Sequence, residues 1–239
     1  MAGAGAVGCF AVSAASYVPF IVIALWILPR RAPAPASERF DRRVLFTGLR
    51  EIAREPYQRG ALLVLLASTT LCGPLITFCP VLVKDALQGN VSQFSIAVGA
   101  FGVGGLLGAI GLLFVDSAGD RRRLISWFAA VFGVIVVLAA LNPWAWGLPA
   151  LLVGAGMSMS VCNTSANSLL QASASPQRRG LTVSLYMIVL RGGIALGGLL
   201  TGVSASLLGI RPALLINGAL AVVAAIVIAR GWLRSPLPA

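Results

Sequence analysis

The chain has 239 residues, of which 58% are hydrophobic and only 10% charged, and its mean hydropathy is +0.93. A soluble domain of this length is normally about 25% charged and less than half apolar, so an ordinary soluble fold is excluded. The net charge of +11 would suit a nucleic-acid partner, but the arginines lie in short segments between apolar blocks, where membrane topology accounts for them.

Apolar blocks long enough to cross roughly 30 Å of hydrocarbon follow one another along the chain. They predict an all-α integral membrane fold with seven transmembrane helices, at 3–28, 60–83, 93–115, 124–141, 144–171, 181–207 and 212–229. We divide the chain into a first transmembrane helix (1–29), a cytoplasmic Arg-rich linker (30–59), a six-helix transmembrane bundle (60–232) and a cytoplasmic tail (233–239).

The long polar segment lies between the first and second blocks. It opens with Arg-Arg-Ala-Pro-Ala-Pro-Ala, whose prolines favour an extended linker. Further on, Leu45, Leu49, Ile52 and Ala53 recur at helical spacing, with charged residues on the other side, until a proline ends the pattern. An amphipathic helix on the membrane surface and a solvated linker helix both fit this pattern.

Basic residues are distributed very unevenly between alternate loops. Fifteen of them lie in the linker, in the loops at 121–123 and 178–179 and in the tail, whereas the opposite loops hold only Lys84 and Arg211. This bias predicts that the Arg-rich loops and the carboxyl terminus are cytoplasmic and the amino terminus is outside. A secretory signal would require a basic residue before the first block, and the sequence has none there. We therefore expect that further transmembrane helices belong upstream of it.

A family resemblance begins near Gly48. The run Gly-Leu-Arg-Glu at 48–51, the Gly73-Pro74 pair within the second block, and Pro-Val-Leu-Val-Lys-Asp at 80–85 follow in order. This order resembles the start of the second half of major facilitator transporters, most of all the siderophore and drug exporters of the enterobactin-exporter-like group. The resemblance covers about four fifths of the chain. It implies that the first block is the sixth helix of a transporter and that the rest is its carboxyl-terminal six-helix bundle.

The loop after the third block resembles the second copy of the family's cytoplasmic signature, Gly-x-x-x-Asp-Arg-x-Gly-Arg-Arg. Asp116, Gly119, Arg121 and Arg122 carry the likeness, while Ser117 and Asp120 replace basic residues of the signature. By resemblance these residues form a charge relay between two bundles. Ordinary positive-inside topology accounts for the arginines equally well.

Glycine patterns near the sixth block carry a second resemblance. Arg179 and Gly180 match the family's loop between its tenth and eleventh helices, and Gly192, Gly193 and Gly197 match its glycine-rich helix. Glycines at such intervals let helix backbones approach closely, which suits helices that must rock. Static bundles contain similar runs, so the pattern supports a conformational role without requiring one.

The fifth block is the most polar and supplies most of the expected substrate contacts. Asn163, Asn167 and Gln171 recur at steps of four, so they share one helix face that drifts by about 40° per step. Polar groups at this depth must face protein or water. The resemblance implies that this helix lines the central cavity, and we add Thr70 of the second block as a further contact. Hydrogen bonds between helices, with no substrate, are the alternative.

Arg191 lies about ten residues into the sixth block, roughly 15 Å from its cytoplasmic end. An arginine at the centre of a membrane helix costs about 2.5–3.5 kcal/mol, so we expect it to face the bundle or a cavity. There it would attract an anionic group of the substrate, or pair with an acidic residue of another bundle. The seven acidic residues themselves all lie in loops or at block ends. Proton coupling therefore has no evident carboxylate here.

The sequence thus predicts secondary active export of a small, siderophore-like or drug-like molecule across the plasma membrane, by an incomplete half of a transporter. A non-transporting remnant, or a helical assembly module, is the alternative. Histidine is absent, which excludes Ser-His and Cys-His catalysis and a histidine-ligated metal. We expect no enzyme activity, cofactor, metal or nucleic-acid partner. The expected partners are the lipid bilayer, the substrate, and an amino-terminal half or a second copy.

Overall fold

A computed structural model describes residues 5–27, 55–115, 120–175 and 179–234, and these ranges contain helices and no strand. The chain divides into two compact units, Met1–Arg42 and Arg43–Ala239. The first unit contributes α1 (Gly5–Ile27), a 23-residue helix with Pro19 inside it and apolar residues on every side. A helix that is apolar all round is typical of a membrane span or a buried core.

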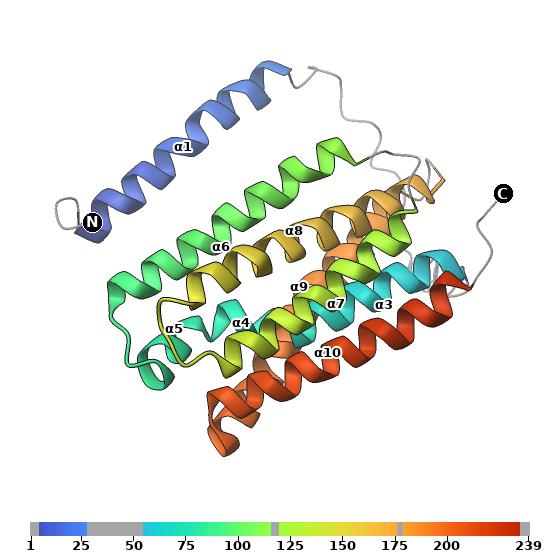
Figure 1. The fold of residues 1–239 in the computed structure, drawn as a ribbon. Coiled ribbons are helices and arrows are strands. Elements are labelled where there is room, and N and C mark those ends of the chain that lie inside the picture. The colour runs from blue at the N-terminus through green and yellow to red at the C-terminus, as the bar shows by residue number, and fades with distance from the viewer. Residues whose placement is uncertain (1–4, 28–54, 116–119, 176–178, 235–239) are drawn as a thin grey trace. The chain divides into compact units, whose positions relative to one another are not determined.

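The second unit is a bundle whose helices run side by side (Figure 1), and its described residues form six long helices. Its elements are α3 (Pro56–Leu71), α4 (Pro74–Thr77), α5 (Cys79–Val81), the π-helical turn η1 (Leu82–Ala86), α6 (Val91–Gly111), the 3₁₀ turn η2 (Leu112–Phe114), α7 (Arg121–Leu141), α8 (Leu148–Ala172), α9 (Arg179–Leu208) and α10 (Ile210–Leu233). The amphipathic segment expected at 43–54 lies outside the described residues.

Five helices of the described chain are long and apolar enough to cross a membrane. They are Pro56–Thr77, Val91–Phe114, Arg121–Leu141, Arg179–Leu208 and Ile210–Leu233. The expected all-α membrane fold is therefore confirmed. Two of the seven expected spans do not meet these criteria. In α1 the described stretch Ser13–Trp26 is an apolar helix of fewer than 18 residues, and α8 has 25 residues but carries many polar side chains.

The second predicted span is interrupted where the sequence places Gly73-Pro74. Because Pro74 has no N–H, the Thr70 carbonyl lacks its donor four residues on. α3 ends at Leu71, and the N–H groups of Cys72 and Gly73 both donate to the Ser68 carbonyl, at 2.8 and 3.3 Å. The helix resumes at Pro74. The Gly73-Pro74 pair therefore coincides with a break in the helix.

Close helix contacts depend on glycines that have no side chain in the way. α6 packs mainly against α8, where a Cβ at Gly104 would collide with the Val153 carbonyl and one at Gly156 with the Phe101 carbonyl. α9 meets α3 in the same manner, since a Cβ at Gly197 would collide with the Thr70 carbonyl. Small residues at helix contacts are the common means of close packing in membranes.

Candidate functional site

α8 contacts four other long helices of the bundle, α6, α7, α3 and α9. Its least covered side carries polar residues: Asn167 and Gln171 are half-buried, and Thr164 is exposed. The Gln171 Nε2 group donates to Asn167 Oδ1 at 2.9 Å, so the two amides form a pair along the helix. This pair leaves further donors and acceptors of both amides available to a ligand or to water.

Asn163 faces α3 more than the amide pair does. It lines a cavity of about 10 Å³ together with Ser68, Thr69, Gly73, Phe132, Met159 and Cys162. That volume holds about one water molecule. A drug-sized ligand needs roughly 300–1,000 Å³, so this cavity admits water and no substrate in the conformation described. On the other side, the Tyr186 hydroxyl donates to the Asn163 carbonyl at 3.3 Å and links α9 to α8.

Thr70 lies at the break in α3, against the glycines of α9. Its hydroxyl is buried and has no hydrogen-bond partner among the described residues. A Cβ at Gly193 would collide with the Thr69 hydroxyl and lie 3.3 Å from that of Thr70. Gly193 and Gly197 therefore allow the close contact between α3 and α9. Gly192 and Gly180, by contrast, have open space where a Cβ would be.

Some other buried polar side chains of the bundle have hydrogen-bond partners, and others have none among the described residues. The Asn217 amide of α10 donates to the Thr201 hydroxyl of α9 at 2.7 Å, and both residues are buried. The buried hydroxyls of Ser126, Ser158 and Ser165 have no partner among the described residues. With Thr70, these unpaired hydroxyls are spread over α3, α7 and α8.

Arg191 is exposed and lies on the side of α9 away from its packed glycines. It is two residues from the buried Gly193, or about 200° around the helix. The structure does not bring Arg191 together with Thr70 or with the amide pair, and it forms no ion pair with another described residue. Its guanidinium is therefore presented on a surface that this bundle leaves uncovered.

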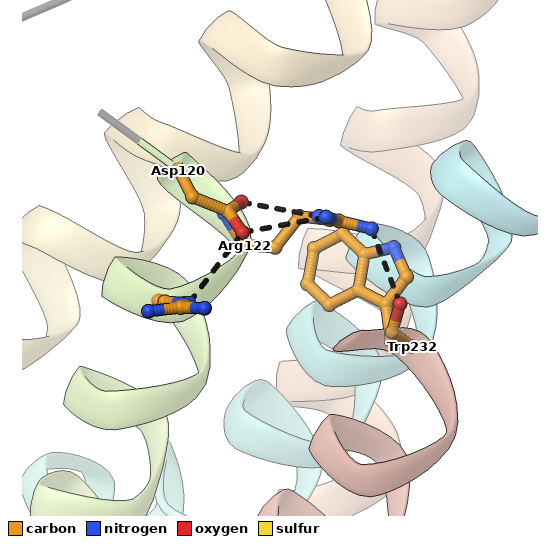
Figure 2. A network of polar contacts seen from close by, with 4 residues as sticks. Asp120, Arg122 and Trp232 are labelled. Atoms are coloured by element: carbon orange, nitrogen blue, oxygen red, sulfur yellow. Dashed lines mark hydrogen bonds and ion pairs between the residues drawn. The ribbon is translucent and has the colours of Figure 1, made fainter. Parts of the chain in front are cut away.

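A polar cluster at the Arg-rich end joins the start of α7 to α10 (Figure 2). The Arg122 side chain, 5% exposed, donates from Nε to Asp120 Oδ1 at 3.1 Å and from Nη1 to the Trp232 carbonyl at 3.3 Å. Its guanidinium also lies 5.6 Å from the ring centre of Tyr57. These contacts hold together the start of α3, the start of α7 and the end of α10.

Asp120 is the central acceptor of this cluster, and the sequence did not assign it a role. It caps α7 by accepting from the Arg122 backbone N–H at 3.1 Å, and Arg123 Nε lies 3.7 Å from its Oδ2. Burial alone would raise the pKa of this carboxyl, but the hydrogen bonds from Arg122 and the charges of Arg122 and Arg123 outweigh it and lower the pKa. The only available signal was an aspartate directly before a helix start.

Two of the other predicted motif residues, Arg121 and Arg179, form no ion pair with Asp120 in the described part of the chain. Asp116 and Gly119 lie outside the described residues, Arg121 is half-buried, and Arg179 is exposed. No three histidine, cysteine, aspartate or glutamate residues gather within the described ranges as metal ligands would. The described cysteines, Cys72, Cys79 and Cys162, are buried free thiols.

A family model described as transmembrane secretion effector matches residues 1–237 of the chain. The match includes α1 and every helix of the second unit. No curated protein matches the chain as a relative.

Proposed function

This chain belongs to the transmembrane secretion effector family of the major facilitator superfamily, and on that premise we propose that it exports a small siderophore-like or drug-like molecule as one half of a secondary transporter. It is a multi-pass membrane protein of a transporter family. In the proposal, the Arg-rich helix ends face the cytoplasm, the amino terminus lies outside, and the membrane is the plasma membrane.

The observation that carries this proposal is the polar, least covered side of α8. Thr164 is exposed and Asn167 and Gln171 are half-buried, and all three lie toward the end of α8 at Ala172. An unsatisfied polar group facing lipid costs several kcal/mol, so this side is best explained as facing a water-filled path. Transporter sites lie between two repeats or bundles near the bilayer midplane, and in the proposal this side of α8 lines the path that leads from the Arg-rich end toward such a site.

The proposal requires a second bundle. Alternating access is the rocking of two bundles about a site between them, and the described chain from 56 to 233 forms one six-helix bundle. The second bundle would face α8 and the uncovered side of α9, where Arg191 would meet an anionic substrate group or an acidic side chain. Coupling to protons would also need a carboxylate from that bundle, since the described acidic residues, Glu55, Asp85 and Asp120, lie at helix ends.

Proteoliposomes test the proposal, with ethidium and enterobactin as probes and an imposed pH gradient. The purified chain alone should give no saturable flux above empty liposomes. Co-expression with helices one to five of a full-length family member should give flux, and the Asn167→Leu/Gln171→Leu variant should reduce it at least tenfold. Saturable flux from the chain alone would refute the half-transporter proposal. Absence of flux from the co-expressed pair would favour the non-transporting remnant or assembly module instead.

A further inference from the structure

A groove on the outer surface of the bundle lies between α7 and α10, which run side by side (Figure 1). It has a volume of about 500 Å³ and lies at the end where α7 starts and α10 finishes. Its floor and sides are almost entirely apolar, and its mouth has an arginine from each helix, Arg123 and Arg230. No residue of the α8 polar side or of the small cavity lines it.

The packing of α7 and α10 explains why the groove forms there. Near their middle the helices touch, since a Cβ at Gly218 would lie 2.7 Å from the Val137 side chain and 3.0 Å from the Gly133 carbonyl. Toward the Arg-rich end the facing residues are alanines and a serine, which leave a trough between larger side chains. The bond from Arg122 to the Trp232 carbonyl fixes the distance between the two helix ends. The groove is therefore a fixed feature of the bundle.

The side chains at the mouth suit an anion at the membrane surface. The Arg123 side chain is 80% exposed, and its contact with Asp120 is a single 3.7 Å approach that leaves its other N–H groups free to donate. Arg230 is exposed and forms no hydrogen bond or ion pair with other described residues. Beside them Trp127 is 68% exposed, and tryptophan is enriched at the level of lipid headgroups. Guanidinium groups match the geometry of phosphate oxygens.

We propose that this groove binds one anionic phospholipid from the leaflet that surrounds the Arg-rich helix ends. The headgroup phosphate lies between Arg123 and Arg230, and an acyl chain follows the alanine floor for about 10–12 Å, the length of the lined helix segments. Basic pockets between transmembrane helices bind lipid headgroups in this way. A free phosphate would satisfy the arginines and leave the apolar floor bare. A zwitterionic lipid would fill the floor but bring a cation beside two arginines.

The fluorescence of Trp127 reports whether a lipid occupies the groove. The full chain is reconstituted in phosphatidylcholine vesicles with rising fractions of phosphatidylglycerol brominated on its acyl chains, and tryptophan quenching is recorded. The same titration of Trp127→Phe is subtracted, because the chain has five tryptophans. Half-maximal quenching should need a lower fraction of brominated phosphatidylglycerol than of brominated phosphatidylcholine. We expect about a fivefold difference for each arginine, from about 1 kcal/mol per basic residue at an anionic surface.

Three double variants separate binding in the groove from general attraction to surface charge. Two of them remove two positive charges each, from different places, and the third keeps the charge. Arg123→Gln/Arg230→Gln should abolish the preference, and Arg123→Lys/Arg230→Lys should keep most of it. Arg59→Gln/Arg179→Gln, which removes exposed arginines at the same end of α3 and α9, should keep all of it. Equal quenching by both lipids, an unchanged preference in the first variant, or an equal loss in the Arg59/Arg179 control would overturn the proposal. Reversal by 10 mM inorganic phosphate would overturn it too, since the groove would then take a free anion.

Discussion

The Arg122 side chain at the Arg-rich end and a set of hydroxyls in the middle of the bundle differ in whether they are paired. At the end, Arg122 is buried and its donors reach Asp120 and the Trp232 carbonyl. In the middle, the buried hydroxyls of Thr70, Ser158 and Ser165 have no partner among the described residues. Fully paired buried groups make one arrangement rigid, whereas unpaired ones are costly and mark places where water, a ligand or another surface is expected. We interpret the end as a structural clamp and the middle as the part that works on substrate.

The largest expected effect is loss of the clamp. Arg122→Ala should destabilise the bundle by about 3 kcal/mol, because it leaves Asp120 without its main partner and the Trp232 carbonyl without its side-chain donor. Thermal unfolding in detergent measures this, with Arg179→Ala as the control. Arg179 is exposed, so its removal should change stability by less than about 0.5 kcal/mol. Equal stability of the two variants would show that the cluster is no clamp.

A smaller effect is expected for the paired polar group in the membrane. Thr201→Val keeps the shape of the side chain but removes the acceptor of the buried Asn217 amide. An amide left unsatisfied costs about 1–3 kcal/mol, so we expect destabilisation in that range. The double variant Thr201→Val/Asn217→Leu should recover part of it, because both polar groups are then gone. A double variant as unstable as the sum of both single changes would contradict this account.

The pH dependence of Asp120 should contribute less, since a quarter of its side chain is exposed. Its pKa is lower in the folded protein than the ordinary aspartate value, so its stabilising contribution is complete above that ordinary value. The contribution is lost as the pH falls through the lowered pKa, where the folded carboxylate takes up a proton. The unfolding temperature of the wild type, minus that of Asp120→Asn, should therefore shrink between about pH 5 and pH 2. A difference that grows on acidification would mean that the sign assigned to this carboxyl is wrong.

Much of the fold follows from the sequence because apolar length and Gly–Pro chemistry act locally. The helices at 93–115 and 181–207, the break at Pro74 and the packing role of Gly193 and Gly197 were all predictable in this way. The side of a helix that its neighbours cover was not predictable, because α9 is nearly as apolar on its exposed side as on its packed side. That is why Arg191 could be placed in depth but not in direction.

The surroundings of the site side chains were also not predictable from the sequence, for similar reasons. Over eight residues the α8 stripe drifts by about 80°, so Asn163 lines a cavity with α3 while Gln171 pairs with Asn167 on the less covered side. Asp120 was read as a departure from a motif, although its partners Arg122 and Arg123 are only two and three residues away. The bond that joins this cluster to α10 is made by Arg122 to the Trp232 carbonyl, 110 residues further along the chain. Pairings of that kind depend on tertiary packing, which no local pattern encodes.

The smallest expected change in stability is at Thr70, and it contrasts most sharply with Thr201. Both are threonines in membrane helices, but the Thr70 hydroxyl has no partner among the described residues. Thr70→Val removes an unsatisfied buried group and keeps the shape, so the free energy of unfolding should stay within about 0.5 kcal/mol or rise. If the hydroxyl instead serves the transport path, the same variant should lower flux severalfold when the second bundle is supplied. Destabilisation as large as that of Thr201→Val would show that Thr70 has a structural partner in the membrane, and its assignment to the substrate path would then fail.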